Sequence, residues 1–343
     1  MNRISDTQKR KADHIQINLK ENVESAITNG LESYHFVHCA LPEIDLSQID
    51  TSIQFLGKTV AIPFLISSMT GGTKDAFLIN QNLARNAEKF NIAMGVGSQR
   101  VGLENDSAMQ AFKVRQYAPN ILLFANIGAI QLNYSYSVEH CKRIVDAIEA
   151  DALILHLNPL QESLMLNGDT KFSGLLSRIE LVCKNIPVPV IAKEVGWGIS
   201  VDVAKKLVDA GIQVIDVAGA GGTSWSEVEK HRLVSKDQKA TASAFRDWGI
   251  PTAECIARIH QAIPTAKIIA SGGLRNGLEI AKCIALGASL GGMARQFLLP
   301  ASESEENLCE ATMVFKKQFE IAMFCVGAKK ISELRTGKIL RAD

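Results

Sequence analysis

Residues 267–295 read KIIASGGLRNGLEIAKCIALGASLGGMAR, and this stretch decides the fold. An apolar run leads into two glycines, an amphipathic segment and a second apolar run. Asn276, with Glu279 three residues later, resembles a helix capping box, and Gly287 suits the end of that helix. Apolar strands without polar alternation are typical of a parallel sheet that helices cover on both faces. The stretch therefore predicts a strand, a crossover helix and a parallel strand.

The same pattern recurs along the whole chain. Eight apolar runs are strand candidates, at residues 64–69, 92–98, 121–127, 152–157, 190–195, 214–219, 267–271 and 289–294. Helical patterns lie at 75–90, 105–118, 137–150, 173–185, 252–262 and 303–321, and a further helix is capped by Ser200 and stopped by Gly211. Eight strand and helix units in one chain predict an α/β fold, a TIM (β/α)8 barrel.

Two regions exceed a minimal barrel. Residues 1–60 form an expected N-terminal extension, whose segment 52–62 predicts a hairpin that plugs the bottom of the barrel. The connection from 219 to 267 carries a polar stretch at 226–247, long enough for a lid or an interface. We expect residues 61–343 to form the barrel itself.

The composition excludes some classes of function. The chain has 37 Lys and Arg residues against 36 Asp and Glu, so no bulk charge would attract nucleic acid or a membrane. The seven cysteines show no C-x-x-C pair, which argues against a disulfide scaffold or a zinc site. The N-terminus carries no apolar leader, and no run of 18 apolar residues follows. We expect a soluble, cytoplasmic protein.

Polar and glycine-rich segments follow almost every predicted strand, where barrels place their functional residues. Gly272 and Gly273 would let the backbone approach an anion at a helix N-terminus, and Gly291-Gly292 would open a second approach. Small residues that merely make turns are the alternative for any single loop. Gly219 and Gly221 could begin the dinucleotide-binding pattern G-x-G-x-x-G, but Ser224 stands where its third glycine belongs. The sequence therefore does not predict a Rossmann-type site here.

The stretch SGGLRNGLEIAKCIALGAS (271–289) resembles the phosphate-binding segment of FMN-dependent TIM barrels. The resemblance implies an FMN site with Lys193 near the N1–C2=O edge of the flavin; a lysine that simply pairs with Glu194 is the alternative. The cofactor contacts it implies are Ser68, Met69, Thr70, Ser98, Asn126, Lys193, Thr223, Gly272, Gly273, Leu274, Arg275, Ala294 and Arg295.

Further motifs distinguish among these flavoproteins. Hydroxy acid oxidases place a His and an Arg after strand six and IMP dehydrogenases a cysteine, and residues 218–225 contain none of them. The motifs RKADHI, SSMTGGT, MGVGSQR, HLNPLQE, AKEVGWG and GAGGTSW together resemble type 2 isopentenyl diphosphate isomerase, in order and over nearly the whole chain.

HLNPLQE (156–162) is the most specific of these motifs. A lone carboxylate beside diphosphate oxygens suits Mg²⁺, which shares substrate phosphate as a ligand. The resemblance assigns Glu162 to the metal, and His156, Asn158 and Gln161 to the substrate, with His156 and Gln161 as catalytic residues. A hydrogen-bonded core histidine and a solvated loop acid are the alternatives for His156 and Glu162.

The basic residues at the N-terminus complete the predicted site. The resemblance places Arg10 and Lys11 on the substrate diphosphate, with Ser98 and Arg100 as further contacts; a solvated tail is the alternative reading. It implies isomerisation of isopentenyl diphosphate with reduced FMN, NADPH as the reductant, and a homo-oligomer, tetramer or octamer. The rivals are another FMN barrel oxidoreductase, such as an α-hydroxy acid oxidase or a glutamate synthase, and a non-catalytic phosphate-binding barrel.

Overall fold

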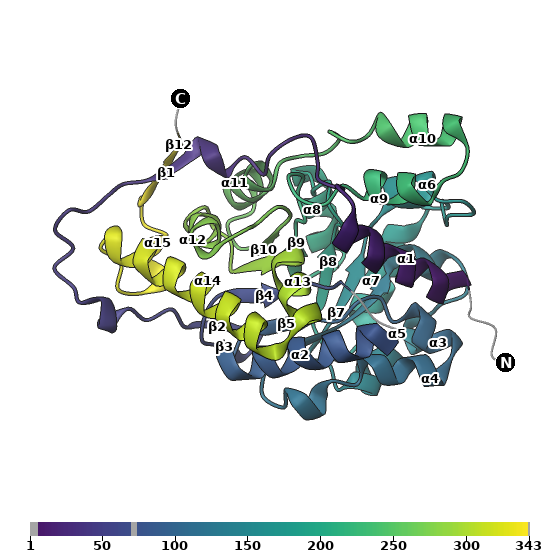
Figure 1. Cartoon of the computed structure of the whole chain (residues 1–343), viewed down its shortest axis with the longest axis horizontal. Helices are drawn as coiled ribbons and strands as arrows, with labels where there is room; N and C mark the ends of the chain where they lie inside the picture. The colour runs from purple at the N-terminus through teal and green to yellow at the C-terminus, as the bar shows by residue number, and fades with distance from the viewer. Residues whose placement is uncertain (1–5, 70–73, 342–343) are drawn as a thin grey trace.

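The computed structural model describes residues 6–69 and 74–341, and its centre is a closed parallel barrel (Figure 1). Its strands are β4 (Phe64–Ile66), β5 (Ala93–Gly95), β6 (Leu123–Gly128), β7 (Ala152–His156), β8 (Val190–Lys193), β9 (Val214–Asp216), β10 (Lys267–Ser271) and β11 (Leu290–Met293). Each pairs with the next, and β11 pairs with β4 to close the barrel. The predicted barrel and all its strands are confirmed.

Helices surround the barrel. They are α2 (Lys74–Phe90), α5 (Val138–Ile148), α6 (Pro159–Leu164), α7 (Leu175–Asn185), α8 (Val201–Asp209), α11 (Thr252–Ala262), α12 (Gly277–Ala285), α13 (Arg295–Glu303), α14 (Glu305–Cys325) and α15 (Ile331–Leu334). Short 3-10 turns lie at Leu31–Ser33, Leu46–Gln48 and Ala129–Asn133. None of the helices in the described ranges is long and apolar enough to cross a membrane.

The single helix predicted for 105–118 is wrong. This part of the chain forms α3 (Arg100–Glu104), α4 (Asp106–Met109) and two 3-10 turns, Gln110–Phe112 and Arg115–Tyr117. Asn105 has extended backbone angles, and its side chain accepts a hydrogen bond from the Ser107 N–H. An N-cap at this position ends one helix and starts another, which an amphipathic pattern alone does not reveal.

The two predicted helix caps form with one difference. Ser200 accepts a hydrogen bond from the Val203 N–H, as expected. Asn276 accepts one from the Glu279 N–H, but the Glu279 carboxylate accepts from the N–H of Arg275 and the amide of Asn29. Only half of a capping box is present, because the Glu279 side chain also ties the N-terminal segment to the barrel.

The predicted hairpin closes the bottom of the barrel. Strands β2 (Ile53–Phe55) and β3 (Lys58–Val60) are antiparallel, and Leu56 and Gly57 turn with φ angles of 46° and 84°. Phe55 and Val60 belong to a buried cluster with apolar side chains of all the barrel strands. The hairpin therefore fills the interior that the barrel strands leave open at this end.

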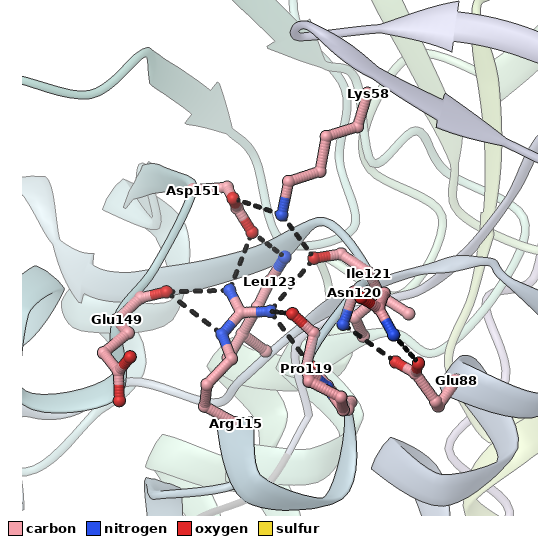
Figure 2. Close-up of polar contacts among 10 residues, drawn as sticks. Lys58, Glu88, Arg115, Pro119, Asn120, Ile121, Leu123, Glu149 and Asp151 are labelled. Carbon is pink, nitrogen blue, oxygen red and sulfur yellow. Dashed lines mark hydrogen bonds and ion pairs between the residues drawn. The ribbon is translucent and has the colours of Figure 1, made fainter.

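A polar cluster fastens the hairpin to the barrel strands (Figure 2). The Asp151 carboxylate lies 2.6 Å from Lys58 Nζ and 2.7 Å from the Arg115 guanidinium, and it accepts from the Leu123 N–H. Arg115 also donates to backbone carbonyl oxygens, including those of Ile121 and Glu149. Both charges of the Asp151 and Arg115 pair thus have several partners.

Segments outside the barrel cover its other end. Helix α1 (Asp6–Lys20) contacts α9 (Trp225–Arg232), and the His14 and Trp225 rings meet edge to face with centroids 5.0 Å apart. Helices α9 and α10 (Lys236–Ser243) lie in the stretch predicted as a lid or an interface, and that role stays a prediction. Strand β1 (Tyr34–Phe36) pairs with β12 (Ile339–Arg341) close to the C-terminus and away from α1 (Figure 1). The division at residue 60 stays a prediction.

Candidate active site

A cavity of about 300 Å³ lies at the carboxyl ends of the barrel strands. Loops after all of these strands line it, and α1 covers it. Every predicted site residue in the described part of the chain lines this cavity: Arg10, Lys11, Ser68, Met69, Ser98, Arg100, Asn126, His156, Asn158, Gln161, Glu162, Lys193, Thr223, Gly272, Gly273, Leu274, Arg275, Ala294 and Arg295. Thr70 lies outside the described residues.

The glycines after β10 allow two loops to meet. A Cβ on Gly272 would lie 2.0 Å from the Gly219 carbonyl oxygen, and one on Gly273 would lie 2.3 Å from that of Gly221. Within the described residues, no acceptor binds the backbone N–H groups of Gly272 and Gly273. These glycines are needed first for loop packing, and their free N–H groups suit an anion.

The predicted second approach at Gly291-Gly292 is only half right. A Cβ on Gly292 would lie 2.5 Å from the Ser67 hydroxyl, and Gly292 lines the cavity. Gly291 faces the opposite way, because a Cβ there would lie 2.4 Å from a methyl group of Ile280 on α12. Successive residues of a strand point to opposite faces of the barrel, so only one of the pair can face a ligand.

Lys193 does not pair with Glu194, so that alternative is wrong. Its ammonium lies 3.1 Å from the Asp216 carboxylate on β9 and donates to the Ser271 hydroxyl at 3.2 Å. Glu194 points to another environment, where one carboxylate oxygen accepts from the backbone N–H groups of residues 195–197. Burial raises the pKa of Glu194 to about 7, although these N–H groups act in the opposite direction.

His156 lies beside Lys193 in the barrel register and is uncharged at neutral pH. Burial, and next the nearby charge of Lys193, lowers the pKa of His156 to about 3. Its Nδ1 lies 2.8 Å from Asn126 Oδ1, so Nδ1 carries the proton and donates. The Nε2 atom is then an acceptor, and His156 is both a hydrogen-bonded histidine and a cavity residue.

The HLNPLQE motif folds into a connected polar group at the start of α6. Asn158 Nδ2 donates to Gln161 Oε1 at 3.1 Å and to Glu162 Oε1 at 3.0 Å. Gln161 Nε2 donates to Glu229 Oε1 at 2.9 Å, and Glu162 Oε2 accepts from the Asp169 N–H at 2.7 Å. Each side chain is therefore held by a partner, as a preorganised site requires.

Arg10 and Lys11 lie over the cavity and are not a solvated tail. Lys11 Nζ donates to the Ser98 carbonyl oxygen and lies 5.0 Å from the centre of the Phe112 ring. Burial, and next the charge of Arg10, lowers the pKa of Lys11 to about 7. The only polar contact of Arg10 among the described residues is with Met165 Sδ, at 3.9 Å. Two partly buried, weakly paired cations favour an anionic ligand here.

Arg100 lies at the same cavity but already has partners. Its guanidinium pairs with Glu104 at 3.1 Å and with Asp169 at 2.9 Å. Asp169 in turn accepts from the side-chain amide of Gln131. A phosphate bound at Arg100 would have to share the guanidinium with these carboxylates. Arg10 differs, because its only polar contact among the described residues is with Met165 Sδ.

Sequence reasoning missed Glu229, a buried acid on α9. Its carboxylate accepts from His14, Gln161 and Arg232 at 2.7–2.9 Å. Burial opposes ionisation, but these hydrogen bonds together lower the pKa of Glu229 to about 2. Sequence reasoning also missed Asp216 on β9. The only sequence signal for Glu229 and for Asp216 is an acidic residue close to segments assigned to the site. Neither acid belongs to one of the motifs.

Comparison with known proteins places the chain in a family. A family model described as FMN-dependent dehydrogenase matches residues 158–341. An isopentenyl-diphosphate delta-isomerase of Nostoc sp. is 53% identical over 330 residues, which are 96% of this chain and 94% of that protein. The chain belongs to the isopentenyl-diphosphate delta-isomerase family. Another of these isomerases, from Rickettsia africae (strain ESF-5), is 48% identical over 96% of both chains.

Solved structures share the fold of this isomerase family member. A mandelate oxidase variant superposes with a TM-score of 0.69 at 18% identity, over 99% of this chain and 100% of that chain. A flavocytochrome b2 variant gives 0.69 at 17% identity, over 96% and 79%. These two solved structures thus share the barrel, while the isomerases share about half of the sequence. This favours the isomerase over the predicted oxidoreductase alternative.

The cavity of this isomerase family member fits FMN. The hydroxyl oxygens of Ser67 and Ser68 are buried and have no partner in the described structure, although both residues line the cavity. Buried polar atoms of this kind usually bind a ligand or water. Together with the free N–H groups of Gly272 and Gly273 and the ammonium of Lys193, they offer donors to a phosphate and a ring.

A magnesium ion beside the HLNPLQE motif would find the carboxylate of Glu162. Within the described residues there is no group of three or more His, Cys, Asp or Glu side chains that could hold a metal. Glu162 lines the cavity, and the neighbouring Asn158 Oδ1 is buried without a partner. This donor set fits an ion that takes its remaining ligands from water and from substrate phosphate.

Proposed function

We propose that this protein converts isopentenyl diphosphate to dimethylallyl diphosphate by a 1,3-allylic proton shift, with reduced FMN and Mg²⁺. The observation that supports this most directly is that one cavity brings together the HLNPLQE side chains, two N-terminal cations and the glycine turn after β10. Family membership supports the same reaction, because the relatives named above carry that activity in their names.

The diphosphate is proposed to lie under α1. Arg10 offers a guanidinium fork and Lys11 a compact charge, and both line the cavity with little other pairing. A bound anion would raise the pKa of Lys11 again and keep it protonated. Arg100 is proposed as a secondary contact, since its carboxylate partners limit what it can donate.

Glu162 is proposed to hold Mg²⁺ against the diphosphate oxygens. Its Oε1 and Oε2 atoms are each oriented by one donor, Asn158 and the Asp169 N–H. A carboxylate accepts more than one such bond, so both oxygens keep lone pairs for an ion. The metal would neutralise part of the diphosphate charge that Arg10 and Lys11 leave.

His156 and Gln161 are proposed to contact the alkene end of the substrate. His156 is neutral at physiological pH, so it serves as an acceptor through Nε2 and not as a proton donor. Gln161 is held between Asn158 and Glu229, which favours a positioning role for its amide. Bound FMN supplies an electron-rich ring and a position that can carry the proton. Helix α1 covers part of the cavity, which would limit the access of water to carbocation character on the substrate.

Several further attributes belong to the same proposal. NADPH is proposed to supply the reducing equivalents, and the protein is proposed to work as a homo-oligomer, tetramer or octamer. A cytoplasmic location stays a prediction from the sequence.

The test is a cofactor analysis followed by an anaerobic assay. The purified protein should release FMN and not FAD on extraction, because the described part of the chain contains no Rossmann unit that could hold an adenylate. With reduced FMN, Mg²⁺ and isopentenyl diphosphate, it should form dimethylallyl diphosphate with no net consumption of NADPH. Stoichiometric NADPH oxidation with a reduced product would identify an oxidoreductase, and absence of any product would remove the proposal.

A further inference from the structure

Asp216 lies beneath the predicted flavin site without touching the cavity. It is the last residue of β9 and fully buried, with 0% of its surface exposed. Its Oδ1 atom accepts from the Ser271 hydroxyl at 2.5 Å, and its Oδ2 atom lies 3.1 Å from Lys193 Nζ. Lys193 and Ser271 both line the cavity, whereas Asp216 does not. The carboxylate therefore acts on a ligand through these two neighbours.

The charges at this point nearly cancel. Lys193 carries a positive charge and Asp216 a negative one, on adjacent strands whose register places these residues side by side. His156, on the other side of Lys193 in the register, adds no charge at neutral pH because burial and Lys193 depress its pKa. A buried charge without its partner is costly, so the carboxylate also keeps the ammonium in place.

We propose that Asp216 is a positioning residue that holds the ammonium of Lys193 toward the cavity and limits how strongly the site favours reduced over oxidised FMN. The inference rests on the proposed placement of FMN beside Lys193. An unopposed lysine would stabilise the negative charge of a reduced ring fully. With Asp216 at 3.1 Å, the ring meets an oriented but largely compensated charge.

The proposal predicts that the preference for reduced FMN follows the net charge of the Lys193 and Asp216 pair. The wild-type pair has a net charge of zero, Asp216→Asn leaves one positive charge, and Lys193→Met with Asp216→Asn returns to zero. Asp216→Asn should therefore favour reduced FMN at least about tenfold over wild type, equivalent to about 30 mV for a two-electron couple. The double variant should return to within about threefold of wild type, because the net charge is restored.

The experiment measures the midpoint potential of FMN in each reconstituted protein under anaerobic conditions. Asp209→Asn is the matched control, because it removes an exposed carboxylate at the end of α8, outside the barrel. Its potential should equal that of the wild type. No isomerisation assay is needed, so the result does not depend on turnover.

The outcomes separate this inference from the proposed FMN site. Suppose that Asp216→Asn has the midpoint potential of wild type, but that the double variant favours reduced FMN at least tenfold less than wild type. Then Lys193 is beside the flavin and the role of Asp216 is wrong. If wild type, Asp216→Asn and the double variant all have the same midpoint potential, FMN is not beside Lys193, and the proposed placement of FMN is wrong as well. If Asp216→Asn does not fold, Lys193→Met replaces it: its potential should lie below that of the double variant, and equal potentials overturn the proposal.

Discussion

The side-chain nitrogen of Gln161 on α6 lies 2.9 Å from Glu229 Oε1 on α9. The two residues come from the connections after different strands, β7 and β9. The same Glu229 oxygen lies 2.9 Å from His14 Nε2 on α1. One buried carboxylate thus joins the covering helix, the helix after β9 and the predicted catalytic amide.

Replacing Glu229 by Gln should lower kcat at least about tenfold while leaving the FMN content unchanged. A neutral amide holds His14, Gln161 and Arg232 less firmly than a carboxylate that accepts from all three. Steady-state kinetics and flavin absorbance check this. Glu227→Gln is the control, because Glu227 is also buried on α9 but pairs with Lys230 outside the cavity. Equal kcat values in the two variants would contradict the prediction.

Joint replacement of Arg10 and Lys11 by Ala should raise the substrate KM far more than it weakens FMN binding. Each charge-assisted contact is worth about 1.5 to 3 kcal/mol, so kcat/KM should fall on the order of a hundredfold or more. Kinetics at two salt concentrations measure the effect, with Lys20→Ala, exposed on the same helix, as the control. Wild-type values at both concentrations would show that these cations do not bind substrate.

Glu162→Gln should abolish Mg²⁺-dependent turnover and leave FMN binding nearly intact. The substitution removes the charge and one hard oxygen, while an amide oxygen can still accept from Asn158 or the Asp169 N–H. Turnover as a function of Mg²⁺ concentration, together with flavin content and melting temperature, tests this. A variant with normal Mg²⁺ dependence would show that Glu162 is not a ligand.

Glu194 should make the protein less stable as the pH rises from about 4.5 to about 7. Its pKa is raised from 4.5 to about 7, so the folded state binds a proton that the unfolded state releases. The contribution of Glu194 to the free energy of unfolding is present in full below about pH 4.5. It is lost between about pH 4.5 and about pH 7, by about 3 kcal/mol in total.

Urea unfolding of wild type and Glu194→Gln across this pH range measures that contribution. The difference in free energy of unfolding between the two proteins should fall as the pH rises, because Gln does not titrate. Glu310→Gln, at an exposed position of α14, serves as the control. A difference that stays constant from pH 4.5 to 8 would show that Glu194 titrates alike in both states.

Gly272→Ala should destabilise the protein and remove FMN, whereas Gly174→Ala should cost only about 1 kcal/mol. Both glycines have positive φ angles, of 102° and 73°, so both substitutions strain the backbone. Only at Gly272 would the new Cβ also meet a carbonyl oxygen, 2.0 Å away, while nothing lies within 4 Å at Gly174. Equal losses of stability and equal flavin content would refute the loop contact.

The sequence alone determined the barrel and the composition of its mouth. Continuous apolar runs at regular intervals allow few other arrangements, and parallel strands carry the residues that follow them to one end. That is why His156, Lys193 and Gly272 could be assigned to one cavity from separate motifs. The interruption at Asn105 was not readable, because a single side-chain cap decides it.

Only the tertiary structure decided which side chains are partners. Lys193 is adjacent in sequence to Glu194, yet it pairs with Asp216, because neighbours along a strand point to opposite faces and neighbours across strands share one. Gln161 and Glu229 are 68 positions apart and meet because two connections cross the same mouth. Such distances depend on barrel register and on how the covering helices pack, which no periodic pattern encodes.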